Sequence, residues 1–197
     1  HGLKNEGAKI TAQLLETTDA MEVVNDILIP ALDSAGKLFE QGKIFLPQLI
    51  QTASVAQAAF EVIKTTLIER NAAPVSRGEI VLATVKGDIH DIGKNIVRVL
   101  LENYGYTVLD LGRDVPCQLV ADTAKEHGVK LVGLSALMTT TLGAMEETIQ
   151  LVKASCPDCK IVVGGAVLTA DYAEKIGADY YAKDAMETVA VAKEVVG

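Results

Sequence analysis

The second half of the chain alternates short apolar runs with segments of helical periodicity. The runs predict strands at residues 80–85, 107–111, 131–135, 161–163 and 180–182. The segments beside them predict helices at residues 93–104, 118–127, 142–155, 170–176 and 185–195. Strands that alternate with helices form a parallel sheet covered on both faces. Such an α/β domain favours the flavodoxin-like strand order 2-1-3-4-5, in which ligands bind beyond the carboxyl ends of the strands, where the order reverses.

The first half of the chain has helical spacing and no convincing strand. Pro30 suits the first turn of a helix that continues to residue 40, because proline has no N–H to donate within a helix. A long helix rich in alanine is expected at residues 46–70. These features predict a bundle of about four helices. The expected domains are a helical cap at residues 1–72 and an α/β domain at residues 78–197, joined by a linker at residues 71–77.

Composition excludes several classes of partner. The net charge is −8 and there is no cluster of Lys and Arg, which argues against nucleic acid. The sequence has no apolar run of membrane-spanning length and no signal peptide, so we expect no membrane partner. The low, odd number of cysteines favours a reducing, cytoplasmic location. Of the three cysteines, Cys156 and Cys159 form a C-x-x-C pair, which we interpret as two free thiols in a turn before a strand. The start at His1, inside a helical pattern, favours a piece of a longer protein.

The segment GDIHDIGKN, residues 87–95, follows the first predicted strand. Asp88 and His90 are two residues apart, so in an extended loop their side chains point to the same side. A carboxylate that accepts the proton of one imidazole nitrogen leaves the other nitrogen as a lone-pair donor, as at metal-ligating histidines. Gly93 lets a ligand approach the backbone, and the helix that starts there offers free N–H groups to an anion.

Three interpretations of this motif compete. In a structural one, His90 caps the helix and Asp88 fixes a turn. A phospho-acceptor site of the receiver type needs a carboxylate after the third strand, and the segment LSALMTTT there has none, so we reject it. In the third interpretation His90 binds a metal that is held in a cofactor, because two aspartates and one histidine make a poor transition-metal site.

The loops after the third and fourth strands favour the cofactor. Residues 135–141 are small and rich in hydroxyl groups, and Gly164, Gly165 and Ala166 have little or no side chain. Together with Gly93, these residues outline a slot between neighbouring strand ends. A bare metal ion does not need a slot, whereas a cofactor with a long tail does.

Taken together, D-x-H-x-x-G at Asp88, His90 and Gly93, S-x-L at Ser135 and Leu137, and the Gly164-Gly165 pair resemble the signature of cobalamin-binding domains. The segment LFEQGKIFLPQLIQTA, residues 38–53, is similar to the helical cap of cobalamin-dependent methionine synthase and of corrinoid proteins of methanol and methylamine metabolism. Of these proteins, methionine synthase has the sequence that the first half of the chain resembles most. The resemblance implies that His90 binds cobalt from below and that Asp88 bonds its other nitrogen.

The resemblance also implies the remaining site. Thr141 stands where the synthases have a serine that extends this hydrogen-bonded chain, so Asp88, His90 and Thr141 would be the catalytic set. The expected contacts to the cofactor in the α/β domain are Gly87, Asp88, Ile89, His90, Asp91, Ile92, Gly93, Ser135, Leu137, Thr139, Gly164, Gly165 and Ala166. In the cap, Phe39 and Leu46, with Leu49 nearby, would shield the upper face, although such apolar stripes are also typical of bundle cores.

The function that this resemblance implies is a methyl carrier. Methylcobalamin would take its methyl group from methyltetrahydrofolate and give it to homocysteine, and the carrier would need methyl-donor and methyl-acceptor methyltransferase modules and a reductive activation partner. The chain has no folate-binding barrel or zinc thiol site, so it is not expected to complete this reaction alone. The alternatives are a freestanding corrinoid protein of a methanol, methylamine or O-demethylase system and a B12-dependent sensor.

Overall fold

The computed structural model describes residues 2–69 and 76–197. The chain divides into two compact units, one formed by residues 1–76 with 102–105 and the other by residues 77–101 with 106–197. We call them the helical unit and the α/β unit. Most of the predicted linker, residues 71–75, lies outside the described residues.

The α/β unit contains a five-stranded sheet in which every neighbouring pair is parallel. Its strands are β1 (Glu79–Thr84), β2 (Thr107–Asp110), β3 (Leu131–Ser135), β4 (Lys160–Gly164) and β5 (Tyr180–Ala182). The strand order β2-β1-β3-β4-β5 is the flavodoxin-like order that the sequence predicted. Residues 80–84 of β1 are all buried, as expected of a strand covered on both faces.

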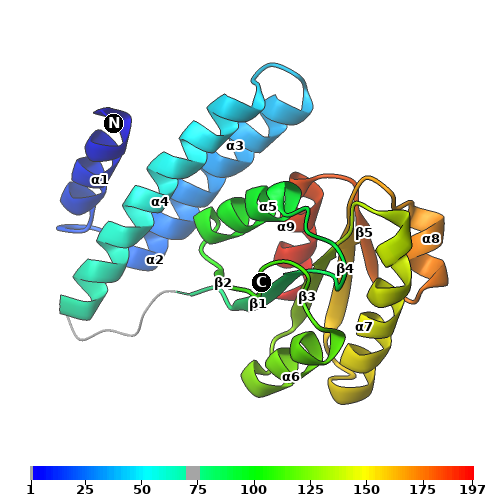
Figure 1. The fold of residues 1–197 in the computed structure, drawn as a ribbon. Helices are drawn as coiled ribbons and strands as arrows, with labels where there is room; N and C mark the ends of the chain where they lie inside the picture. Colours follow the sequence, from blue (N-terminus) through cyan, green and yellow to red (C-terminus); the bar gives the residue numbers. More distant parts are fainter. Residues whose placement is uncertain (1, 70–75) are drawn as a thin grey trace. The chain divides into compact units, whose positions relative to one another are not determined.

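Helices cover both faces of this sheet (Figure 1). They are α5 (Ile92–Asn103), α6 (Cys117–His127), α7 (Leu142–Ser155), α8 (Ala170–Lys175) and α9 (Ala185–Val195), each within one residue of its predicted bounds. Side chains of β1, β3 and β4 pack with α6, α7 and α8 in one buried cluster that includes Val81, Ala124, Val132, Met145 and Val163. Alternate residues of the strands face the other side, on which α5 and α9 lie.

The helical unit confirms the predicted helical cap. It contains α1 (Gly2–Leu14), α2 (Ala20–Glu22), a π-helix η1 (Val23–Leu28), α3 (Ile29–Glu40) and α4 (Leu46–Glu69). Three alanines of α4, Ala53, Ala56 and Ala59, are buried, and a Cβ added at Gly7 of α1 would lie 2.6 Å from the side chain of Val55. Small residues therefore let α1 and α4 pack closely.

The chain around Pro30 differs in one respect from the prediction. The helix α3 starts at Ile29, next to Pro30, as expected. However, no break in the helical backbone separates it from the preceding segment, because η1 leads directly into it. The N–H of Ile29 donates to the carbonyl of Val24, five residues earlier. In an α-helix a proline ring clashes with the carbonyl of the residue four positions earlier. The π-helical turn is wider, so the ring of Pro30 is accommodated there without this clash.

Two further predictions concern the cysteines and the membrane. Cys156 and Cys159 are free thiols in a turn between α7 and β4, as predicted, and the N–H of Cys159 donates to the carbonyl of Cys156 at 3.0 Å. Burial raises the pKa of Cys159 to about 12, which makes its thiolate a rare species and a redox role a poor fit.

Within residues 2–69 and 76–197, no helix is both long and apolar enough to span a membrane.

Candidate functional site

The register of the sheet brings the motif-bearing loops together. Thr84 of β1 is level with Ser135 of β3, which is level with Gly164 of β4. The loops after these strands therefore leave the sheet side by side at its carboxyl edge. Residues 87–93, 136–141 and 165–166, which are far apart in the sequence, meet at this edge as the sequence predicted.

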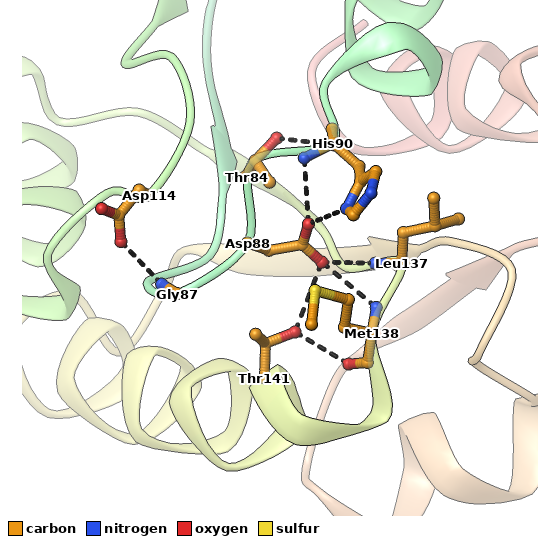
Figure 2. Close-up of polar contacts among 8 residues, drawn as sticks. All are labelled: Thr84, Gly87, Asp88, His90, Asp114, Leu137, Met138 and Thr141. Carbon is orange, nitrogen blue, oxygen red and sulfur yellow. Dashed lines mark hydrogen bonds and ion pairs between the residues drawn. The ribbon is translucent and has the colours of Figure 1, made fainter.

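Asp88 lies at the centre of the polar contacts at this edge (Figure 2). Its side chain is fully buried, and its Oδ1 accepts hydrogen bonds from the backbone N–H of His90 at 3.0 Å and from ring atom Nδ1 of His90 at 2.8 Å. Its Oδ2 accepts from the backbone N–H groups of Leu137 at 2.6 Å and Met138 at 3.2 Å. The carboxylate therefore links the loop after β1 to the loop after β3.

These hydrogen bonds determine the charge of Asp88. Burial raises its pKa, but the backbone N–H groups of Leu137, His90 and Met138 and the His90 ring outweigh burial and lower the pKa from 3.8 to about 2. An ionised carboxylate only accepts hydrogen bonds, so the proton between the two side chains belongs to Nδ1 of His90. In the neutral ring Nε2 then carries the lone pair, which is the arrangement that a metal ligand requires.

Thr141 is placed to extend this chain, as predicted. Its buried hydroxyl lies 3.3 Å from Oδ2 of Asp88 and 2.8 Å from the carbonyl oxygen of Met138. A hydroxyl has one proton to donate, and the shorter distance favours the carbonyl. The backbone N–H groups of Leu137 and Met138 are therefore the main donors to Oδ2, and Thr141 is a secondary one.

The His90 side chain opens to the surface among apolar side chains. It is 47 % exposed, and nearby Ile89 in the same loop is 60 % exposed and Ile92, the first residue of α5, is 78 % exposed. Leu137 and Met138, from the loop after β3, are also exposed. A nitrogen lone pair within an apolar rim matches a ligand that combines a metal with a large apolar face.

Gly164 at the end of β4 and Gly165 directly after it have a packing role. A Cβ added at Gly165, whose φ is +138°, would lie 1.8 Å from the carbonyl oxygen of Ala136. A Cβ at Gly164 would lie 3.1 Å from the carbonyl oxygen of Ala182. The loops after β3 and β4 therefore approach backbone to backbone. Gly93, in the first turn of α5, is different, because a Cβ there would meet no atom within 4 Å.

The remaining predicted residues fall into two groups. Gly87, Asp91, Ser135, Thr139 and Ala166 lie at the same carboxyl edge and are half-buried or exposed. Phe39 and Leu46 of the helical unit are half-buried, and Leu49 is buried. A role for these three in covering the cofactor stays a prediction, because they belong to a separate unit.

Sequence reasoning missed the loop after β2. Because β2 is the neighbour of β1, this loop runs beside residues 86–90. Oδ1 of Asp114 accepts a hydrogen bond from the N–H of Gly87 at 2.7 Å. Nearby, the buried ammonium of Lys94 in α5 pairs with Asp110 at the end of β2, and Arg98 pairs with the same carboxylate at 3.2 Å. A Gly-Arg-Asp turn after a strand, at residues 112–114, was the available signal.

Comparisons with known proteins agree with this geometry. A family model described as a B12 binding domain matches residues 78–190, and a second model with the same description matches residues 1–64. The chain belongs to the B12-binding family. It is 43 % identical to dimethylamine corrinoid protein 1 of Methanosarcina acetivorans, over 90 % of this chain and 84 % of the relative.

Two further relatives extend the comparison. Trimethylamine corrinoid protein 1 of Methanosarcina mazei is 39 % identical over 94 % of this chain and 88 % of its own length. The methanol:cobalamin methyltransferase complex of Methanosarcina barkeri contains a chain that is 27 % identical with a TM-score of 0.81, covering 99 % of this chain and 80 % of that one. These relatives support the predicted cobalamin cofactor. They favour corrinoid proteins over methionine synthase, which the resemblance of the first half of the chain had favoured.

The donor set at the carboxyl edge fits a cobalamin. Among the described residues, no group of three or more His, Cys, Asp or Glu side chains could hold a metal ion. A metal bound by His90 must therefore bring its other ligands with it, as cobalt does within a corrin ring. The apolar surface exposed near His90 by Ile89, Ile92, Leu137 and Met138 suits the face of such a ring.

The buried charge of Asp88 leads to a prediction about acid stability. Because its folded-state pKa lies below 3.8, the ionised carboxylate stabilises the apoprotein above about pH 4, and this contribution is lost as the pH falls from about 4 to about 2. We expect Asp88→Asn to lower the free energy of unfolding by roughly 2 kcal/mol at pH 7, with a difference from the wild type that shrinks towards pH 2. Urea unfolding of the apoprotein at several pH values measures this.

The control is Asp91→Asn, which removes a carboxylate three residues away in the same loop and is expected to leave the pH dependence unchanged. A constant difference between Asp88→Asn and the wild type from pH 7 to pH 2 would contradict the role given to the ionised carboxylate.

Proposed function

We propose that this chain is a corrinoid protein that carries a methyl group for a separate methylamine methyltransferase. Dimethylamine is the first substrate to test, because the dimethylamine corrinoid protein is 43 % identical and the trimethylamine one 39 %. The observation that carries the proposal is the geometry of His90, whose Nδ1 is held by Asp88 and whose Nε2 is left as a ligand at an apolar, exposed edge.

Each residue of the carboxyl edge has a role in this proposal. His90 binds cobalt through Nε2, and Asp88 keeps the proton on Nδ1 and the ring in its orientation. When bound, the cobalamin supplies a metal centre that accepts and donates the methyl group. If Nε2 carried a proton in place of the metal, the carboxylate of Asp88 would stabilise the charged ring.

The loops beside His90 accommodate the rest of the cofactor. The nucleotide tail would lie beside Gly93, where a Cβ would meet no atom within 4 Å, and beside the small residues Ser135, Thr139 and Gly164–Ala166 at the same carboxyl edge. In the helical unit, Phe39 and Leu46, with Leu49, would exclude water from the upper face of the ring. The partner would be a methyltransferase, as in the methanol:cobalamin methyltransferase complex of Methanosarcina barkeri.

Methyl transfer from an amine tests this function. The chain is loaded with hydroxocobalamin, chemically reduced and mixed with dimethylamine and a dimethylamine methyltransferase. We expect about one equivalent of monomethylamine per bound cobalamin, because each carrier takes one methyl group from the amine. Chromatography of the amines measures the product.

Parallel reactions decide between the donors. They pair trimethylamine, methanol and methyltetrahydrofolate each with its own methyltransferase. Efficient demethylation of methyltetrahydrofolate with no reaction of any amine would overturn the proposal and return the chain to the methionine synthase group. Failure to bind hydroxocobalamin at all would contradict the assignment of the site.

A further inference from the structure

The loop after β2 contacts the backbone of two successive residues in the loop after β1. The N–H of Gly87 donates to Oδ1 of Asp114 at 2.7 Å (Figure 2). The carbonyl oxygen of the next residue, Asp88, accepts from the N–H of Asp114 at 2.9 Å. Asp114 therefore contacts the peptide group before Gly87 and the peptide group after Asp88, the residue that carries the buried carboxylate.

The backbone of Asp114 is unusual. Its φ is +51°, and no other non-glycine residue in the described part of the chain has a positive φ. This left-handed conformation is unfavourable for most side chains and tolerable for Asp and Asn. It lets the N–H and the carboxylate of Asp114 both contact the loop after β1, so the conformational cost serves these two hydrogen bonds.

These bonds are not needed to attach one loop to the other. The N–H of Thr84 donates to the carbonyl of Gly112 at 3.0 Å, and the N–H of Val115 donates to the carbonyl of Thr84 at 3.1 Å. Those two backbone bonds already fasten the loop after β2 to the end of β1. The side chain of Asp114 adds a contact only at Gly87, whose φ of +85° lies in the region that favours glycine. The N–H of Asp88 donates to the carbonyl of Val85 at 3.0 Å, so the Asp114 side chain is a second restraint on the turn that contains Gly87.

We propose that Asp114 is a positioning residue for the axial histidine. It fixes the backbone of Asp88, and Oδ1 of Asp88 in turn holds both the backbone N–H and the ring of His90. Asp114 thereby favours the ring orientation in which Nε2 faces the metal. This rests on the proposed function, because it assumes that His90 is the cobalt ligand.

Two substitutions separate the side chain of Asp114 from its backbone. Asp114→Gly adopts the left-handed conformation without strain but has no acceptor for the N–H of Gly87. Asp114→Asn keeps both the conformation and an acceptor oxygen. If the histidine-bound fraction falls in the glycine variant and returns to the wild-type value in the asparagine variant, the lost hydrogen bond is the cause.

The measurement is electron paramagnetic resonance of the cobalt(II) holoprotein, in which a histidine ligand splits the signal through its nitrogen. It is made at one pH, chosen so that the wild type contains histidine-bound and histidine-free forms in comparable amounts. We expect the ratio of free to bound forms to rise about fivefold in Asp114→Gly, the effect of one ordinary hydrogen bond, and to stay near the wild-type value in Asp114→Asn. Cobalamin binding is measured for each variant.

The outcomes distinguish this inference from the proposed function. If the wild type shows no nitrogen splitting that His90→Gly abolishes, the cobalt ligand is wrong and both fail. If the wild type shows it and Asp114→Gly matches the wild-type ratio, only the role of Asp114 is overturned. Amide exchange of the wild-type apoprotein tests the same bond without a variant, because the N–H of Gly87, on an exposed residue, is expected to be protected. Exchange at the rate of an unbonded amide would also overturn the role.

Discussion

His90→Gly is expected to bind hydroxocobalamin and to lose methyl transfer by roughly 100-fold or more, at the upper end of what disturbing a metal-ligand system costs. The cofactor is expected to remain bound because the substitution leaves Gly93, Gly164 and Gly165, the residues proposed to accommodate its nucleotide tail, unchanged. Transfer falls because the variant has no imidazole to coordinate the metal and no ring for Asp88 to orient. The measurements are cobalamin affinity and the rate of monomethylamine formation.

The chain offers a matched control in His127. Its Nδ1 also pairs with a carboxylate, that of Glu79, at 3.0 Å, and both side chains are partly exposed. Glu79 begins β1 and His127 ends α6, so this pair lies at the opposite end of the sheet from the candidate site. His127→Gly should transfer methyl groups at the wild-type rate. Equal rates for His90→Gly and the wild type would remove His90 as the ligand.

The sequence predicted the fold and the centre of the site because both depend on local patterns. Alternating strands and helices imply parallel strands whose carboxyl ends share one edge, and this placed the loops after β1, β3 and β4 together. The two-residue spacing of Asp88 and His90 predicted their contact, which the structure shows at 2.8 Å. These inferences need only the period of each element and the order of the strands.

Contacts that depend on three-dimensional detail were not predictable in this way. The role of Asp114 requires a left-handed backbone and the placement of β2 beside β1. The pairing of Lys94 with Asp110 joins a helix to a strand that follows it in sequence. For Gly165 the sequence suggested room for a cofactor tail, whereas the structure adds contact with the backbone of Ala136. The donor of the methyl group depends on partner surfaces, which no motif in the chain describes.

Gly165→Ala is expected to destabilise the α/β unit by about 3 kcal/mol or more. Its Cβ would lie 1.8 Å from the carbonyl oxygen of Ala136, and a backbone carbonyl in a neighbouring loop cannot turn aside as a flexible side chain can. The φ of +138° adds strain for any residue with a Cβ. The loops after β3 and β4 would have to separate, which would also displace the Leu137 N–H from Asp88. Urea unfolding of the apoprotein and cobalamin affinity measure both effects.

Gly93→Ala is the control for Gly165→Ala, because it makes the same chemical change at the same edge of the sheet. Its Cβ would meet no atom within 4 Å, and Gly93 lies in the first turn of α5, so the free energy of unfolding should stay the same or rise by up to about 1 kcal/mol. If Gly165→Ala were as stable as Gly93→Ala, the loops would not be in backbone contact. The two glycines of the slot would then share one role, to leave room for the cofactor, and the packing role of Gly165 would be wrong.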